Sequence, residues 1–136
     1  MTAPAAPKRR LMIVDDAAMM RLIITNMLRG DPRFEVTATC ENGQVALDQL
    51  KTANPDIILV DLEMPVMDGL TFIRNARLKS RAKIVVLSSV AEAGSPKALE
   101  ARRLGAAAVL QKPSGPVSLD LQQKSGSKIV DTLLSV

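Results

Sequence analysis

The sequence contains no histidine, tryptophan or tyrosine, two phenylalanines and a single cysteine. Without histidine, the chain lacks Ser-His and Cys-His catalytic pairs, histidine metal ligands and a phosphohistidine of its own. The single Cys40 excludes an internal disulfide and a zinc site built on several cysteines, and we interpret it as a small buried hydrophobic residue. Any phosphoryl chemistry in this chain must therefore use a carboxylate.

Long apolar runs are also missing. No run approaches the roughly 18 apolar residues that a membrane-spanning helix needs, and Met1 to Arg10 do not have the charge order of a secretion signal. We therefore expect a cytoplasmic protein with no membrane partner. The formal net charge is +4, but the basic residues are dispersed and stacking aromatics are nearly absent, so direct binding of nucleic acid is not expected.

What is present is the composition of one ordinary globular domain. The chain has 136 residues, of which 47% are hydrophobic and 24% charged, so one core built on aliphatic side chains is sufficient. We predict a disordered lead-in over residues 1–9 and a single domain over 10–136. Within that domain, residues 113–126 are expected to form a loop before a short C-terminal helix.

Short apolar runs alternate with helical patterns. The runs are rich in β-branched residues and too short for independent helices, which is typical of strands in a parallel sheet. Strands are predicted at residues 11–14, 34–40, 57–60, 84–87 and 107–110, and helices at 20–28, 46–53, 69–78, 95–105 and 127–134. This pattern predicts an α/β fold, a single doubly wound (βα)5 domain with five parallel strands. The strand order 2-1-3-4-5 is adopted from flavodoxin-like proteins rather than worked out from the pattern.

Three carboxylates follow two of the predicted strands. Asp15 and Asp16 come directly after the first strand, and Asp61 comes directly after the third. Ligands of such sheets bind at the carboxyl ends of the strands, so the three acids should meet at one edge. Their repulsion, about 1 kcal/mol per close pair in water and several times more when partly buried, calls for a hard cation with oxygen ligands such as Mg²⁺.

A hydroxyl and an ammonium group follow the last two strands. Ser88 can donate to a phosphoryl oxygen, and Lys112 can pair with a carboxylate or with another phosphoryl oxygen. Each residue alone has an ordinary alternative interpretation as a helix cap, a turn residue or surface charge. The combination of acids, hydroxyl and lysine at successive strand ends instead favours a carboxylate that forms an acyl phosphate.

Four motifs in this order and spacing resemble the receiver domains of response regulators. They are V-D-D at 14–16, D-L-E-M-P-V-M-D-G at 61–69, L-S-S at 87–89 and K-P at 112–113. The resemblance implies that Asp61 is the phosphoacceptor of a two-component system and takes its phosphoryl group from a histidine kinase. It also implies a Mg²⁺ ion held by Asp15, Asp16, Asp61 and the backbone carbonyl of Glu63.

The resemblance further implies that Ser88 is the switch hydroxyl and that Lys112 binds the phosphoryl group. A closer similarity is to the receiver of chemotaxis-type protein-glutamate methylesterases, carried by residues 63–65, 68–72, 88–89 and 112–120. Those proteins carry a hydrolase domain with a Ser-His-Asp triad, whereas this chain stops at Val136 without a histidine. It is therefore expected to be no enzyme itself. It is either an excised receiver that regulates such a domain or a stand-alone relative, with a chemotaxis-type kinase and an output domain, in cis or in trans, as partners.

One departure and two alternatives remain at this stage. Val109 stands where the family often has an aromatic residue whose ring swings inward on activation, so the conformational response cannot take that form. The first alternative is an aspartyl-phosphate phosphatase, with Glu63 as the general acid or base two residues after the nucleophile. The second is an interaction module that keeps the fold but has lost phosphorylation.

Overall fold

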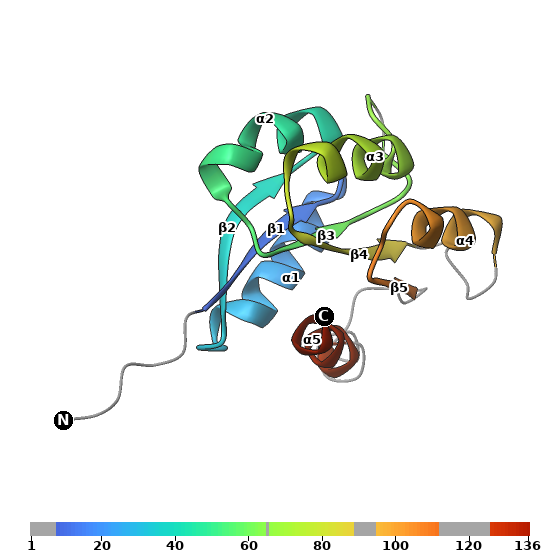
Figure 1. The fold of residues 1–136 in the computed structure, drawn as a ribbon. Coiled ribbons are helices and arrows are strands. Elements are labelled where there is room, and N and C mark those ends of the chain that lie inside the picture. The colour runs from blue at the N-terminus through green and yellow to red at the C-terminus, as the bar shows by residue number, and fades with distance from the viewer. Residues whose placement is uncertain (1–7, 65, 89–94, 112–125) are drawn as a thin grey trace.

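The computed structural model describes residues 8–64, 66–88, 95–111 and 126–136. Strands and helices alternate along these residues, and the five strands form one parallel sheet in the order β2-β1-β3-β4-β5 (Figure 1). The strands are β1 Arg9–Val14, β2 Phe34–Cys40, β3 Ile57–Val60, β4 Lys83–Ser88 and β5 Ala108–Gln111. The helices are α1 Ala18–Arg29, α2 Gly43–Ala53, α3 Gly69–Lys79, α4 Pro96–Arg103 and α5 Gly126–Ser135. The predicted α/β class and strand order are confirmed.

Three strands differ from the prediction by one or two residues, and β4 is one residue longer at each end than the predicted 84–87. Arg9, which we assigned to the lead-in, is the first residue of β1, because its backbone N–H donates to the carbonyl of Arg33 beside the start of β2 at 2.9 Å. The last strand runs from Ala108 to Gln111, one residue later than predicted. Most of the predicted lead-in and nearly all of the predicted 113–126 loop lie outside the described residues.

Helix starts follow capping chemistry. The side chains of Asn42, Asp68 and Ser95 accept hydrogen bonds from backbone N–H groups at 2.9, 2.8 and 3.2 Å, at the starts of α2, α3 and α4 respectively. Pro96 fits the first turn of α4 because a helix leaves that N–H unpaired. Gly105 follows α4 with a φ of 115°, a left-handed conformation that glycine adopts without strain. Among the described helices, none is both long and apolar enough to cross a membrane.

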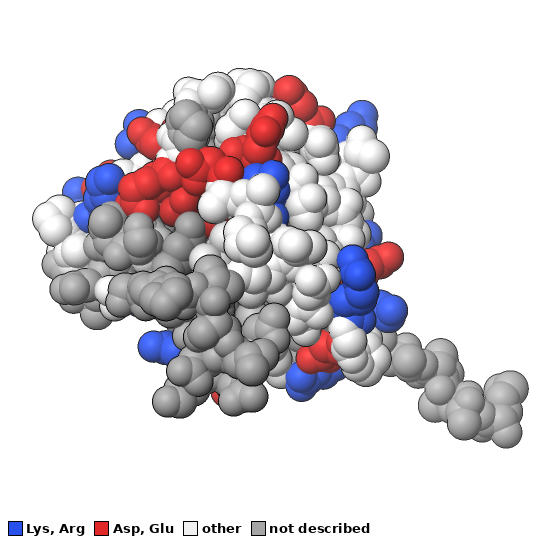
Figure 2. Space-filling view, turned by 180° about the vertical axis from the view of Figure 1, so that it is seen from behind, with Lys and Arg blue, Asp and Glu red and all other residues white. Residues whose placement is uncertain are grey.

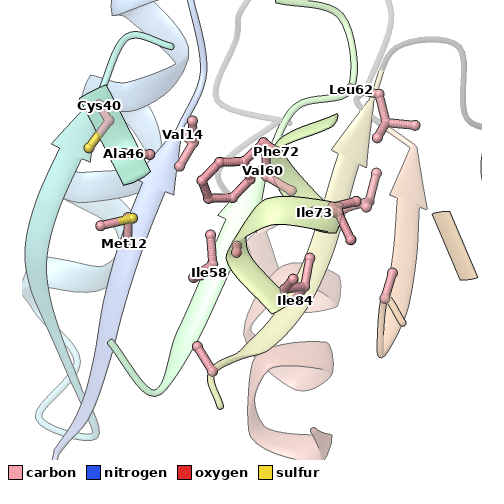
Figure 3. Close-up of a cluster of buried hydrophobic side chains, with 14 of the residues drawn as sticks. Met12, Val14, Cys40, Ala46, Ile58, Val60, Leu62, Phe72, Ile73 and Ile84 are labelled. Carbon is pink, nitrogen blue, oxygen red and sulfur yellow. The ribbon is translucent and has the colours of Figure 1, made fainter. Parts of the chain in front are cut away.

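Two apolar layers cover the sheet. Helices α2, α3 and α4 pack on one face and α1 and α5 on the other (Figure 1). The first layer is centred on Phe72, which is fully buried and lies near Val14 and Val60 (Figure 3). Cys40 belongs to the same layer and is 1% exposed, which confirms its interpretation as a buried hydrophobic residue. Because both faces are covered, polar side chains of the central strands reach solvent mainly at the strand ends.

Candidate functional site

Acidic side chains converge where β1 and β3 end. The two strands are paired, with Val14 opposite Val60, so Asp15 and Asp61 leave the sheet side by side. The backbone N–H of Asp61 donates to the carbonyl of Val14 at 2.9 Å, and that of Asp15 donates to the carbonyl of Cys40 at 3.0 Å. These bonds extend the sheet by one residue and fix the positions of both acids.

One carboxylate oxygen from each of Asp15, Asp16 and Asp61 lies within 4.8 Å of the other two. The side chains of Asp15 and Asp61 are buried, at 2% and 4% exposure, whereas Asp16 is exposed. The structure therefore brings together the three acids that the sequence placed at this edge. Acidic side chains gather in one patch on the face shown in Figure 2, while basic side chains are scattered over that face.

The loop after β1 is held by its own backbone and by one cation. The N–H of Ala17 donates to the Oδ1 of Asp15 at 2.9 Å, and the guanidinium of Arg21 donates to the backbone carbonyl of Asp15 at 2.6 Å. Ala17 is the N-cap of α1, so the alternative interpretation of the Asp pair as a helix cap does not hold. Sequence reasoning missed Arg21. The feature of the sequence that could have indicated this contact is a cation near the start of α1, six residues after Asp15.

The loop after β3 requires a glycine. The N–H of Glu63 donates to the Oδ1 of Asp61 at 3.3 Å, and the N–H of Gly69 donates to the carbonyl of Leu62 at 2.9 Å. A Cβ atom on Gly69 would lie 2.5 Å from both the Asp61 carbonyl oxygen and the Leu62 Cα, closer than any side chain tolerates. The D-G pair at 68–69 thus combines a helix cap with a close backbone contact beside Asp61.

Ser88 lies at the end of β4 and is fully buried. Its Oγ is 2.7 Å from the Oε2 of Glu63 and 3.0 Å from the Oε1, so the hydroxyl donates to that carboxylate. The Oε1 of Glu63 is in turn 3.8 Å from the ammonium nitrogen of Lys97 in the first turn of α4. The sequence suggests two roles for Glu63, a metal ligand through its backbone carbonyl or a general acid or base in the phosphatase alternative, and none for Lys97. The contacts of the two side chains with Ser88 and with each other are therefore a finding of the structure. Lys112 lies outside the described residues.

The donor set determines which ion this edge suits. Three carboxylates supply only oxygen atoms, the ligands that Mg²⁺ and Ca²⁺ prefer, and they include neither the thiolate nor the imidazole typical of zinc sites. Two of the three are buried, which strengthens their mutual repulsion. A divalent cation would remove this repulsion, so the residues present fit such an ion.

Val109 lies on β5 and is partly buried. It packs against the apolar layer that contains Ala98 and Ala101 of α4. An aliphatic side chain there fills space between β5 and α4, but it has no ring that could exchange between a buried and an exposed position.

A family model described as the response regulator receiver domain matches residues 11–122. Among curated proteins, the chain is 45% identical over 114 residues to the protein-glutamate methylesterase/protein-glutamine glutaminase of Halalkalibacterium halodurans. That match covers 84% of this chain and 33% of the relative. The chain thus spans about a third of the length of the curated relatives it matches.

Solved structures are similar over nearly the whole chain. The response regulator domain of Thermotoga maritima CheB is 26% identical, with a TM-score of 0.88 and coverage of 95% of this chain and 96% of that one. A chain in the crystal structure of the P1 domain of CheA3 in complex with CheY6 from R. sphaeroides is 50% identical, with a TM-score of 0.75 and coverage of 96% and 100%.

Proposed function

This chain belongs to the response regulator receiver family, and from that premise we propose that Asp61 accepts a phosphoryl group from the phosphohistidine of a histidine kinase. The observation that supports this most directly is the buried Asp61 carboxylate, held by the end of β3 beside Asp15 and Asp16. An acidic cluster of this kind is typical of the metal site of a receiver. The ion we propose is Mg²⁺, held by these three residues and by the backbone carbonyl of Glu63.

The chemistry is a transfer between two nucleophiles. An Asp61 carboxylate oxygen attacks phosphorus, the bond from phosphorus to the histidine nitrogen breaks, and the bonding electrons stay with the imidazole. The product on this chain is an acyl phosphate. A bound divalent cation supplies positive charge next to the phosphoryl oxygens.

Two further side chains complete the proposed site. The hydroxyl of Ser88 lies at the neighbouring strand end and can donate to a phosphoryl oxygen once it leaves Glu63. Lys112 would pair with another phosphoryl oxygen, an assignment that rests on the family resemblance of residues 112–113. Since every proposed group acts on the phosphoryl group attached to the protein itself, we propose no metabolic substrate and no enzymatic turnover.

The relatives support a proposal for the signalling context. The curated relatives named here are protein-glutamate methylesterases, and the CheY6 structure includes the P1 domain of CheA3. We propose that a chemotaxis-type histidine kinase in the cytoplasm is the phosphodonor. The output is a methylesterase domain in cis or a partner protein in trans.

The Glu63 carboxylate argues against the phosphatase alternative. A general acid or base needs access to the leaving group or to a water molecule, whereas this carboxylate accepts the hydroxyl of Ser88 and faces Lys97. The retained acidic cluster argues against a module that has lost phosphorylation.

Labelling by a small phosphodonor tests the proposal. Incubation with acetyl phosphate and Mg²⁺ should add one phosphoryl group to the intact mass, and hydroxylamine should remove it as expected for an acyl phosphate. Asp61→Asn should abolish the gain. Asp68→Asn is the matched control, because an Asn oxygen can still accept the N–H of Thr71 at the start of α3. Undiminished labelling of the Asp61 variant would refute the assignment.

A further inference from the structure

The carboxylate of Glu63 contacts two groups that belong to different elements, Ser88 at the end of β4 and Lys97 in the first turn of α4. We propose that Glu63 and Lys97 are positioning residues that connect the phosphoryl site to α4, so that the first turn of this helix responds to phosphorylation. The inference rests on the proposed function, because it needs a phosphoryl group on Asp61.

The first step is competition for one hydrogen. The hydroxyl of Ser88 has a single proton to donate, and in the unphosphorylated protein it donates to the Glu63 carboxylate at 2.7 Å. Ser88 is fully buried, so its hydroxyl finds acceptors only within the site. When Ser88 donates to a phosphoryl oxygen, the carboxylate of Glu63 loses this bond.

The second step is electrostatic. A phosphoryl group adds about −1.5 to −2 charges at neutral pH. Glu63 lies two residues after Asp61 and its N–H donates to the Asp61 carboxylate at 3.3 Å, so its side chain starts close to the new charge. Repulsion therefore turns the carboxylate away from the site, and Lys97 becomes its partner. The ion pair then shortens from 3.8 Å and draws the first turn of α4 toward the loop after β3.

The position of Lys97 supports this role. The first turn of a helix disfavours a cation, because the partial charge of the helix dipole is positive there. The first turn of α4 contains no acidic residue to offset it. The carboxylate that offsets the charge of Lys97 comes instead from Glu63, across the site.

Helix α4 is weakly anchored, so a small force can shift it. The side chains that α4 buries are those of Ala98 and Ala101, each of which removes little apolar surface from water. Its larger apolar residue, Leu99, is 55% exposed. With Val109 in place of an aromatic residue on β5, the contact between Glu63 and Lys97 offers α4 a separate connection to the site.

Hydrogen exchange of the first turn of α4 tests the inference. The N–H of Leu99 donates to the carbonyl of Ser95 at 2.9 Å, so its exchange reports whether this turn is closed. Adding Mg²⁺ and beryllofluoride, a mimic of the phosphoryl group, should slow this exchange about 1.4- to 5-fold, the range of an exposed ion pair. Lys97→Met should bind beryllofluoride as the wild type does but lose the slowing.

Two further variants complete the design. Glu63→Gln keeps an acceptor for the hydroxyl of Ser88, but its neutral side chain is not repelled by the phosphoryl charge. The exchange of the Leu99 N–H should therefore not slow in this variant either. Arg103→Met removes a cation from the other end of α4, where it pairs with Glu100 at 3.6 Å, and should keep the slowing.

The outcomes separate the two proposals. Suppose that the wild type binds beryllofluoride. If the exchange of the Leu99 N–H then slows as much in Lys97→Met as in the wild type, or does not slow in the wild type, the connection through Glu63 is overturned and the proposed function stands. If the wild type binds no beryllofluoride and is not labelled on Asp61, the proposed function fails, and this inference fails with it.

Discussion

Replacing Asp61 by asparagine should stabilise the protein when no divalent cation is present. One carboxylate oxygen from each of Asp61, Asp15 and Asp16 lies within 4.8 Å of the other two. At that separation each pair of charges repels by about 3.5 kcal/mol at an effective dielectric constant of about 20, and by about 0.9 kcal/mol in bulk water. Two pairs disappear in the variant. Asp16 is exposed and Asp61 makes other interactions, so we expect a net increase of about 1–2 kcal/mol in the free energy of unfolding at pH 7.

The assay is urea unfolding followed by far-UV circular dichroism, since the chain has no tryptophan or tyrosine to give a fluorescence signal. Mg²⁺ at ten times its dissociation constant should stabilise the wild type by about 1.4 kcal/mol. It should stabilise Asp61→Asn much less, so the advantage of the variant shrinks as Mg²⁺ is added. Asp131→Asn, at an exposed acid on α5, controls for the change in net charge and should not alter the effect of Mg²⁺. If Asp61→Asn is less stable without Mg²⁺ and gains as much from Mg²⁺ as the wild type, repulsion does not dominate this site.

Three other predictions concern single positions. Gly69→Ala should lower the free energy of unfolding by about 1–3 kcal/mol or more in the same assay, because its Cβ would lie 2.5 Å from backbone atoms. Gly30→Ala is the control, because the space around Gly30 is open, and it should not lower the free energy of unfolding. The side-chain hydrogen bond from Arg33 lowers the pKa of Asp31 from 3.8 to about 2. The charged form of Asp31 therefore stabilises the fold above pH 4. Asp31→Asn should lower the free energy of unfolding at pH 7 by less than about 1 kcal/mol, because Arg33 is exposed. This difference from the wild type should vanish as the pH falls from 4 to 2. Burial raises the pKa of the Cys40 thiol to about 11, so a thiol reagent at pH 8 should react with the native protein about 100-fold or more slowly than with the urea-unfolded chain, and equal rates would contradict that burial.

The elements and the acidic cluster could be predicted from the sequence because they depend on strong local patterns. The β-branched runs at 57–60 and 84–87 form strands buried on both faces, and parallel pairing brings their carboxyl ends to one edge. The positions of Asp15 and Asp61 follow directly, since each is the first residue after its strand. Ser95 and Pro96 marked the start of α4 because capping depends on residues next to one another in the chain.

Contacts made by long side chains could not be predicted in this way. Glu63 and Ser88 are separated by 25 residues, and their hydrogen bond depends on the path of the loop after β3 and on the rotamer of Glu63. The same holds for Arg21, whose guanidinium reaches back to the carbonyl of Asp15. Lys97 appeared in the sequence as an ordinary surface cation, since nothing in its neighbours indicates a partner on another loop.

The free energy that the ion pair between Lys97 and Glu63 can contribute limits how strong the response of α4 can be. Lys97 and Glu63 have side chains 53% and 31% exposed, and exposed ion pairs contribute about 0.2–1 kcal/mol. A ligand shifts a conformational equilibrium only by the difference in its interaction with the two states. A change of this size corresponds to a shift of about 1.4- to 5-fold at 25 °C. The connection through Glu63 therefore supports a graded change in α4 rather than an all-or-none transition, and a larger response would require contacts beyond this pair.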